Sequence, residues 1–317
     1  MLWWKGAILA AALAAASGVS GQEGGSAPRL RASFVPEARL DLDGWLTEDA
    51  WSNAPAGSAF TQRDPDDGSP ATERTEVRVL YSRSALYIGV RAYDSEASGI
   101  RARLGRRDQV SRSDQVTVFL DSYLDRRSCF EFTVTPAGSI GDAFRTEARG
   151  ADDSWDPVWD VATSVDGEGW TAELRIPFSQ LRFDDEGETW GLQVERIIER
   201  KAESAWWAPF SKESGGFAAH FGLLEGLEGL PTPMRLEVRP YAVASTRRRP
   251  EGTGSTYQPG SASTFNAGFD LQYGLTSNFT LDLTVNPDFG QVEADPSVVN
   301  LTAFETYYPE RRPFFVE

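Results

Sequence analysis

The last part of the chain alternates apolar and polar residues almost without error. Between positions 264 and 273 the apolar residues are Phe265, Ala267, Phe269, Leu271 and Tyr273, and the polar ones are Thr264, Asn266, Asp270 and Gln272. The alternation resumes with apolar Phe279, Leu281, Leu283 and Val285 against polar Thr280, Asp282, Thr284 and Asn286. Because successive side chains in a strand point to opposite sides, this pattern predicts two strands that share one apolar and one polar face.

Consecutive strands of this kind are typical of a membrane β-barrel, although a strand of a soluble sandwich can show the same alternation. A preceding strand is predicted over 235–244, and the polar, Gly-rich segment 247–263 is predicted to be a loop. We therefore predict that residues 235–317 are the N-terminal part of an outer-membrane β-barrel domain. It would be truncated, because the chain stops at Glu317 before a barrel can close.

Residues 32–230 contain many short strand-like runs, separated by Gly, Pro and Asp, with little helical periodicity. The clearest runs are 76–81, 86–93, 115–121, 129–135, 170–176 and 190–197. Turn signals roughly every ten residues are typical of an antiparallel β-sandwich. The predicted fold class is therefore all-β, with one sandwich domain at 32–230 and short helical pieces at 47–53 and 178–182.

The N-terminus has the features of a secretory signal peptide. Lys5 precedes an apolar run of about ten residues, and the small residues 19–21 precede the expected cleavage point. The apolar run is too short to cross a bilayer as a helix. We predict a signal peptide over 1–21, a linker over 22–31, and export to the periplasm or the outer membrane.

The chain is acidic, with 47 Asp and Glu against 31 Lys and Arg and a formal net charge of −16. This charge argues against nucleic acid as a partner, since phosphate binding needs a basic surface. A single Cys and a single His exclude an internal disulfide and a zinc site of the usual kind. All but two of the ten Trp lie outside the predicted signal peptide, and this excess over one His favours binding over catalysis.

Four stretches occur in the order found in family 9 carbohydrate-binding modules. They are 40–51 (LDLDGWLTEDAW), 76–94, 113–121 (SDQVTVFLD) and 169–181 (GWTAELRIPFSQL). Over residues 38–225 the chain resembles this family, which implies a two-sheet β-sandwich and carbohydrate binding. The segment 286–295 (NPDFGQVEAD), together with 300–317, resembles a bacterial outer-membrane protein family of unassigned function, in which such a module precedes a large barrel.

Sugar binding needs flat aromatic faces bordered by polar groups that pair with hydroxyls. Trp155 and Trp159 lie in the acidic, Pro-containing segment 152–160, which suits an exposed sugar shelf; the alternative is that they plug the end of the sandwich. Trp206 and Trp207 are adjacent, so they point to opposite sides of a strand. One is expected in the core, and Trp206 is expected to be the exposed one.

In sugar-binding members of the family, two Trp sandwich the sugar, and one lies just before the strand that matches 114–121. Here the corresponding loop, 106–113, has no aromatic residue, and only Phe217 is available at the second position. The guanidinium groups of this loop could instead clamp the carboxylate of an acidic glycan such as a uronate; the alternative is that they are solvated charges. The candidate carbohydrate-binding residues are Trp155, Trp159, Trp206, Phe217 and Arg112.

Metal and catalytic motifs are weak in this chain. Calcium is an open alternative as a cofactor, with Asp152, Asp153, Asp156 and Asp160 as candidate ligands. No pair among the 47 acidic residues is marked out for glycoside hydrolysis, and His220 lies beside an apolar run without a nucleophile motif. The sequence therefore does not predict an enzyme.

These observations predict non-catalytic binding of a carbohydrate, or of another polar small ligand, at the bacterial cell envelope, linked to carbohydrate uptake or catabolism. A structural alternative is that the sandwich is a docking or plug domain for the barrel, with no sugar ligand. A third interpretation, an accessory role in glycoside hydrolysis, follows only from the association of such modules with hydrolases.

Overall fold

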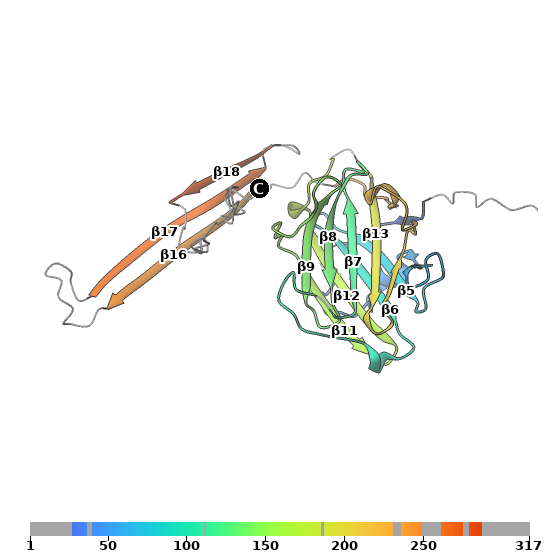
Figure 1. Cartoon of the computed structure of the whole chain (residues 1–317). Helices are drawn as coiled ribbons and strands as arrows, with labels where there is room; N and C mark the ends of the chain where they lie inside the picture. Colours follow the sequence, from blue (N-terminus) through green and yellow to red (C-terminus); the bar gives the residue numbers. More distant parts are fainter. Residues whose placement is uncertain are drawn as a thin grey trace, which may run out of the picture.

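The structure, a computed structural model, describes residues 27–36, 40–110, 112–184, 187–230, 236–248, 261–274 and 279–286. The predicted signal peptide, most of the predicted linker and the segment 287–317 lie outside the described residues. Figure 1 shows a layered, strand-rich unit and, later in the chain, a further sheet, which has three strands.

The first unit is built from two sheets of described strands. The nine-stranded sheet contains, in spatial order, β1 (Arg29–Arg31), β15 (Gly222–Glu225), β13 (Thr189–Ile198), β7 (Gln115–Asp121), β8 (Ser128–Val134), β9 (Ile140–Thr146) and β10 (Gly150–Asp152), with β14 (Glu203–Trp206) beside β13 and β4 (Thr61–Asp64) beside β14. The six-stranded sheet contains β11 (Asp160–Asp166), β12 (Gly169–Pro177), β6 (Ala85–Tyr93), β5 (Thr75–Tyr81) and β2 (Ser33–Phe34), with β3 (Ala56–Gly57) beside β5. Neighbouring strands are antiparallel except in the pairs β1–β15 and β2–β5. The prediction of an all-β, sandwich-like fold is confirmed.

The helices of this unit are short. They are α1 (Asp49–Asn53) and the 3-10 turns η2 (Ala97–Gly99), η3 (Phe178–Gln180), η4 (Glu199–Lys201) and η5 (Ala218–His220). The predicted linker over 22–31 is wrong at its end, because β1 pairs in parallel with β15 and so belongs to the sheet. An ion pair of 2.5 Å between Arg29 and Glu225 joins the same two strands.

The core lies between the two sheets and is filled by alternate residues of their central strands. The nine-stranded sheet contributes Val116, Val118 and Leu120 from β7, and the six-stranded sheet contributes Leu86, Ile88 and Val90 from β6. Trp170 and Trp190 are completely buried in this core and pack its interior. Each such side chain contributes about 2–3 kcal/mol through removal of apolar surface from water.

The first and last stretches of the family resemblance meet at Glu173 on β12. Its carboxylate accepts hydrogen bonds from the backbone N–H groups of Asp43 (3.1 Å) and Gly44 (2.7 Å), and from the Trp51 indole N–H (2.9 Å). Gly44 has φ +86°, and a Cβ there would lie 2.7 Å from the Thr163 backbone, so this turn requires glycine. The segment 40–51 is therefore fixed against the outer side of β12.

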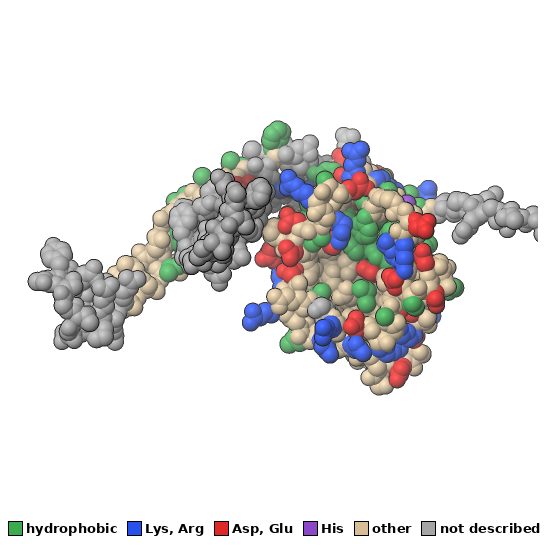
Figure 2. All heavy atoms as spheres, in the orientation of Figure 1, with side chains coloured by type: hydrophobic (Ala, Val, Ile, Leu, Met, Phe, Trp, Pro, Cys, Tyr) green, Lys and Arg blue, Asp and Glu red, His purple; other side chains and the backbone are tan. Residues whose placement is uncertain are grey.

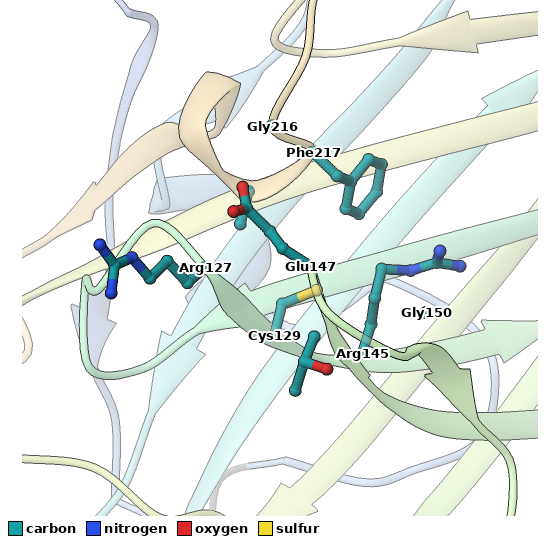
Figure 3. Close-up of a pocket in the computed structure, with 9 residues that line it drawn as sticks. Arg127, Cys129, Arg145, Glu147, Gly150, Gly216 and Phe217 are labelled. Carbon is teal, nitrogen blue, oxygen red and sulfur yellow. The ribbon is translucent and has the colours of Figure 1, made fainter.

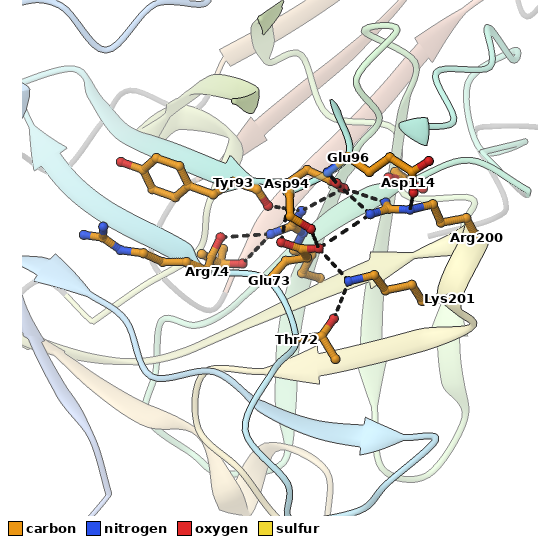
Figure 4. Close-up of polar contacts among 12 residues, drawn as sticks. Thr72, Glu73, Arg74, Tyr93, Asp94, Glu96, Asp114, Arg200 and Lys201 are labelled. Atoms are coloured by element: carbon orange, nitrogen blue, oxygen red, sulfur yellow. Dashed lines mark hydrogen bonds and ion pairs between the residues drawn. The ribbon is translucent and has the colours of Figure 1, made fainter. Parts of the chain in front are cut away.

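A cluster of charged residues closes the end of the sandwich where β6 leaves for β7 (Figure 4). Arg196 on β13 is almost fully buried, and its guanidinium donates to the backbone oxygens of Arg74 (3.0 Å) and Tyr93 (2.7 Å). Asp94 directly follows β6 and accepts two hydrogen bonds of 2.6 Å from Arg200. The cluster thus anchors the start of the long connection between β6 and β7.

The C-terminal group of strands is a three-stranded antiparallel sheet of β16 (Leu236–Arg248), β17 (Ser261–Gly274) and β18 (Thr280–Val285). Its register puts apolar residues opposite one another across all three strands, in the rows Leu236–Tyr273–Leu281, Val238–Leu271–Leu283 and Pro240–Phe269–Val285. The alternate rows are polar, as in Arg239–Asp270–Thr284. The predicted strands with one apolar and one polar face are confirmed.

The ends of these strands differ from the prediction. β16 continues to Arg248 and β17 begins at Ser261, so the predicted loop over 247–263 is wrong at both ends. The pairing of Ser245 with Thr264, whose hydroxyl groups lie 2.6 Å apart, shows why: polar residues here pair across the strands instead of leaving the ladder. Among the described residues, no helix has the length and apolar character needed to cross a bilayer.

Candidate functional site

The outer face of the nine-stranded sheet, which points away from the six-stranded sheet, carries a mixture of aromatic and polar side chains. Neighbouring strands align Glu195 of β13 with Thr117 of β7 and Thr133 of β8. The next outward row contains Phe119 of β7 and Glu131 of β8. Figure 2 shows this face with hydrophobic side chains among both acidic and basic ones.

An aromatic cluster covers one side of this face. Phe119 stacks on Trp206 with ring centroids 5.7 Å apart and meets Phe217 edge-on at 5.1 Å. Phe210 and Phe221 complete the cluster, at 6.0 and 5.2 Å from Phe217. Phe210 and Phe217 are only partly buried, so the cluster presents aromatic surface to a ligand.

Two arginines lie over the rings of the aromatic cluster. The guanidinium carbon of Arg63 is 4.4 Å from the Phe210 centroid and 5.6 Å from that of Trp206. The guanidinium of Arg145 is 5.0 Å from the Phe217 centroid and also pairs with Glu131. Each contact stabilises the arginine by about 0.5–1 kcal/mol and fixes its position beside the polar residues.

Polar groups form the floor beside the aromatic cluster. The hydroxyls of Thr117 and Thr133 are 2.9 Å apart, and Glu195 accepts a 2.6 Å hydrogen bond from Ser204. Burial raises the pKa of Glu195, and its bond with Ser204 opposes that rise. The polar floor, defined here as Thr117, Glu131, Thr133 and Glu195, combines hydroxyls with carboxylates, the groups that pair with ligand hydroxyls.

The connection between β6 and β7 borders the polar floor on the side away from the aromatic cluster. A Cβ built on Gly141 of β9 would lie 3.7 Å from Asp108 of this connection and equally far from Thr133. The Asp108 carboxylate accepts a 3.0 Å hydrogen bond from the backbone N–H of Asp142. Asp108 therefore lies next to the floor, and the exposed Arg112 follows it in the same connection.

A pocket of about 360 Å³ lies on the other side of Phe217 (Figure 3). Its lining includes the charged side chains of Arg127, Arg145 and Glu147 around Phe217 and the buried Cys129. Burial raises the pKa of the Cys129 thiol, so this sulfur is protonated and acts as a small apolar surface. The pocket offers hydrogen-bond donors, acceptors and one aromatic ring within a volume typical of small-ligand sites.

The predicted tryptophan shelf is wrong for Trp159 and largely so for Trp155. Trp159 is only 6% exposed and donates a 3.1 Å hydrogen bond from its indole N–H to Asp142. Trp155 is partly buried and packs on Phe132, with ring centroids 5.7 Å apart. Both indoles cover the end of the core, because Phe132 offers them an apolar surface on the inner face of β8. The alternative interpretation, that they plug the sandwich, describes their positions.

The expectation that Trp206 is exposed is also wrong, since it is 6% exposed and Trp207 is 3% exposed. The prediction that the two point to opposite sides is confirmed: Trp207 lies in the core and Trp206 in the outer aromatic cluster. Trp206 is covered there by Phe210, Phe217 and Arg63. Of the five candidates, Trp206 and Phe217 belong to one cluster, while Arg112 lies in the connection bordering the floor.

The four calcium candidates do not come together around one point. Asp156 pairs with Arg107 at 2.9 Å and Asp160 with Arg175 at 3.2 Å. Asp152 accepts two hydrogen bonds from Ser154, which lower its pKa. In the part of the chain that the structure describes, no group of three or more His, Cys, Asp or Glu side chains is arranged to hold a metal ion. Calcium binding by these residues stays a prediction.

The residues of the polar floor and the two arginines stacked on the aromatic cluster were not predicted from the sequence. A signal for the floor exists in the strands themselves, since Glu131 and Thr133 alternate with the apolar Phe130, Phe132 and Val134. In a strand whose other face is buried, such residues must lie on the outer face. Arg63 and Arg145 carry no comparable signal, because their partners come from distant parts of the chain.

Comparisons with known proteins support this geometry at the level of the fold. A protein from Bacteroides uniformis, proposed to bind carbohydrate, is 14% identical, covers 63% of this chain and 99% of its own, and has a TM-score of 0.51. Two structures of a family 9 carbohydrate-binding module from Caldicellulosiruptor kristjanssonii each give a TM-score of 0.47. The complex with cellotriose is 15% identical and covers 62% of this chain and 93% of its own. The complex with glucose is 16% identical and covers 65% of this chain and 100% of its own. The similarity to the two Caldicellulosiruptor structures is too low to support an argument. The similarity to the Bacteroides protein shows the fold alone.

Two family models match different parts of the chain. Residues 232–317 match a domain of unknown function, DUF5916. Residues 42–206 match the carbohydrate family 9 binding domain-like family. No curated protein matches the sequence significantly. Because the second model covers just over half of the 317 residues and includes most of both sheets and all four residues of the polar floor, the chain belongs to the carbohydrate family 9 binding domain-like family.

Proposed function

We propose that this protein binds carbohydrate without catalysis, and that its binding site is the outer face of the nine-stranded sheet. The observation that carries the proposal is the polar floor, which lies directly beside the partly exposed rings of the aromatic cluster. Family 9-like domains are non-catalytic binding modules, so the family supports the same conclusion. No proton transfer is needed for such a function.

The chemistry of the face suits a sugar ring. The C–H side of a pyranose packs on an aromatic ring, here Phe217, and its hydroxyls donate to carboxylates such as Glu131 and accept from Arg145. The pocket beyond Phe217 gives a second sugar residue room to enter. Affinity would be roughly micromolar to millimolar, because one exposed stacking contact and a few hydrogen bonds to water-competing groups contribute only a few kcal/mol.

The cellular setting belongs to the same proposal. The protein is exported with its N-terminal signal and acts at the bacterial cell envelope, in the uptake or catabolism of carbohydrate. The apolar run after Lys5 and the alternating strands of the C-terminal segment support this placement. The C-terminal segment is the start of an outer-membrane barrel, with the apolar rows of β16–β18 turned toward lipid.

A glycan-array screen of the full chain, followed by calorimetry on the best ligand, tests the binding function. Phe217→Ala should weaken binding roughly tenfold, since it removes the ring that receives the sugar. Phe34→Ala is the matched control, because Phe34 is 56% exposed on β2 of the other sheet. Absence of binding by a folded chain, with and without calcium, would overturn the proposal. Equal binding by both variants would move the site away from Phe217.

A second candidate function is docking, in which the sandwich plugs or docks onto the barrel and has no sugar ligand. The exposed apolar face of the C-terminal sheet favours it, since Leu236 and Val238 are each 50% exposed and Phe265 is 75% exposed. Docking requires this sheet to associate with the membrane, whereas sugar binding by the sandwich does not. Leu283→Asp should therefore move the full chain out of the membrane fraction of a Gram-negative host, while Thr264→Asp on the polar face should not.

A further inference from the structure

The connection between β6 and β7 concentrates positive charge in an acidic protein. Its residues 101–112, called here the arginine loop, contain Arg101, Arg103, Arg106, Arg107 and Arg112 against a single acidic residue, Asp108. The whole chain has a formal net charge of −16. The loop is therefore a locally basic segment of an acidic chain.

The five arginines have different partners. Arg101 pairs with Glu199 at 3.6 Å, and Arg107 pairs with Asp142 at 2.7 Å and Asp156 at 2.9 Å. Arg103, Arg106 and Arg112 are exposed, and no described residue forms an ion pair with them. Three guanidinium groups are thus available to a ligand.

The backbone that carries these arginines is held in place. The N–H of Arg103 donates to the Ser113 hydroxyl at 3.2 Å, and the N–H of Gly105 donates to the Ser139 hydroxyl at 2.8 Å. The two ion pairs of Arg107 hold the middle of the loop against the strand end at Asp142 and the segment at Asp156. A fixed backbone lowers the entropy that the loop would lose on binding a ligand.

The arginine loop lies beside the proposed sugar site. Asp108 contacts the Gly141 position at the edge of the polar floor. Figure 1 draws the connection between β6 and β7 along the lower part of the sandwich, and Figure 2 shows basic and acidic side chains together at that end. A polymer that crosses the polar floor would therefore reach these arginines with its neighbouring residues.

We propose that the arginine loop binds the carboxylates of an acidic polysaccharide, so that the ligand class of the proposed sugar site is a polyuronate. This inference rests on the proposed carbohydrate function. A uronate residue presents hydroxyls to the polar floor and a planar carboxylate to Arg106 or Arg112, which arginine can bind through two parallel hydrogen bonds. An anionic membrane surface would use the arginines but would have no need of the floor, so we assign the loop to the polysaccharide.

Calorimetry with the full chain tests the assignment, using oligogalacturonate and a neutral galactose oligosaccharide of equal length. Arg106→Gln/Arg112→Gln should weaken oligogalacturonate binding about two- to thirtyfold, as expected for two exposed ion pairs, and should weaken neutral binding much less. Arg83→Gln/Arg182→Gln is the matched control, because both are exposed arginines elsewhere on the chain and the change in net charge is identical. Binding of the wild-type chain to oligogalacturonate should also weaken as salt rises.

The outcomes separate this inference from the proposed function. Binding of neutral but not acidic oligosaccharide would overturn the polyuronate assignment and leave the carbohydrate function standing. Binding of neither would overturn both. Equal losses in the two double variants would show a general charge effect and overturn the role of the arginine loop. Vesicles with anionic headgroups form a third arm, and arginine-dependent binding to them without oligogalacturonate binding would assign the loop to the membrane instead.

Discussion

Replacement of Glu173 by glutamine is the sharpest test of how the family motif holds this fold together. The Glu173 carboxylate receives three donors: two backbone N–H groups on one oxygen, from Asp43 and Gly44, and the Trp51 indole N–H on the other. A carboxylate can accept all three, because both of its oxygens are acceptors. A glutamine amide has one oxygen and one NH2 group, so it can serve either the backbone pair or the indole, but not both.

The expected loss of unfolding free energy follows from the donor that Glu173→Gln leaves without an acceptor. In Glu173→Gln the amide keeps the backbone pair, and the Trp51 indole N–H then faces an NH2 group in a site that is almost fully buried. An unsatisfied buried donor costs about 1–3 kcal/mol. Burial raises the pKa of Glu173 to about 7, so the comparison is made above about pH 8, where the wild-type group is a carboxylate. We expect the free energy of unfolding to fall by about 2 kcal/mol.

Urea unfolding of the full chain, followed by Trp fluorescence, measures this loss as a lower midpoint at unchanged slope. Glu213→Gln is the control, because Glu213 is exposed and its replacement makes the same chemical change outside the core. A loss below about 0.5 kcal/mol, within the usual range for surface substitutions, would refute the reasoning. It would mean that segment 40–51 is held by packing of Trp51 rather than by the three hydrogen bonds.

Two further predictions concern buried charge. Burial raises the pKa of Asp142 from 3.8 to about 6, so the folded state binds its proton more tightly and this group's contribution to stability is lost as pH rises from about 4 to about 6. The stability difference between wild type and Asp142→Asn in urea should therefore shrink over that pH range, and a constant difference would count against the raised pKa. Arg196→Met should lower the free energy of unfolding by about 3–5 kcal/mol, because it removes the buried cation between Asp94 and Asp114, leaving Arg200 as the partner of Asp94, and takes the donor away from the backbone oxygens of Arg74 and Tyr93. Thermal unfolding would compare it with the exposed control Arg83→Met. A fall in melting temperature equal to that of the control would show that Arg200 alone neutralises the carboxylates around Asp94.

The sandwich could be predicted from the sequence because its signals are local. Alternation over 115–121 and 170–176 fixes which side chains face the core, and turn residues mark the strand ends. The edge of the sheet could not be predicted in the same way. Arg29–Arg31 alternates, with Leu30 buried between two exposed arginines, but three residues are too few to predict a strand. It becomes one because β15, nearly two hundred residues later, offers it a parallel edge.

The site could be predicted only in part, because exposure depends on packing between distant segments. Trp159 lies among acidic residues in the sequence, which suggests a surface position, yet its indole is buried against Phe132 and its N–H finds Asp142. Trp206 is covered in the same way by Phe210 and Arg63. Polar neighbours in sequence therefore say little about an indole when its partners in space come from other strands.

The loss of an aromatic residue from the loop before β7 has a chemical consequence for the ligand. A sugar sandwiched between two indoles is recognised through its C–H surfaces, which most neutral pyranoses share. Among the described residues, Phe217 and its cluster lie on one side of the polar floor, and Asp108 of the arginine loop lies beside the floor at Gly141. At the site that we propose, recognition would then depend on charge and hydrogen bonding at that side, which discriminate between sugars by their substituents more strongly than stacking does. The absence of an aromatic residue from the loop 106–113 therefore supports the narrower, charged class of ligand that we propose.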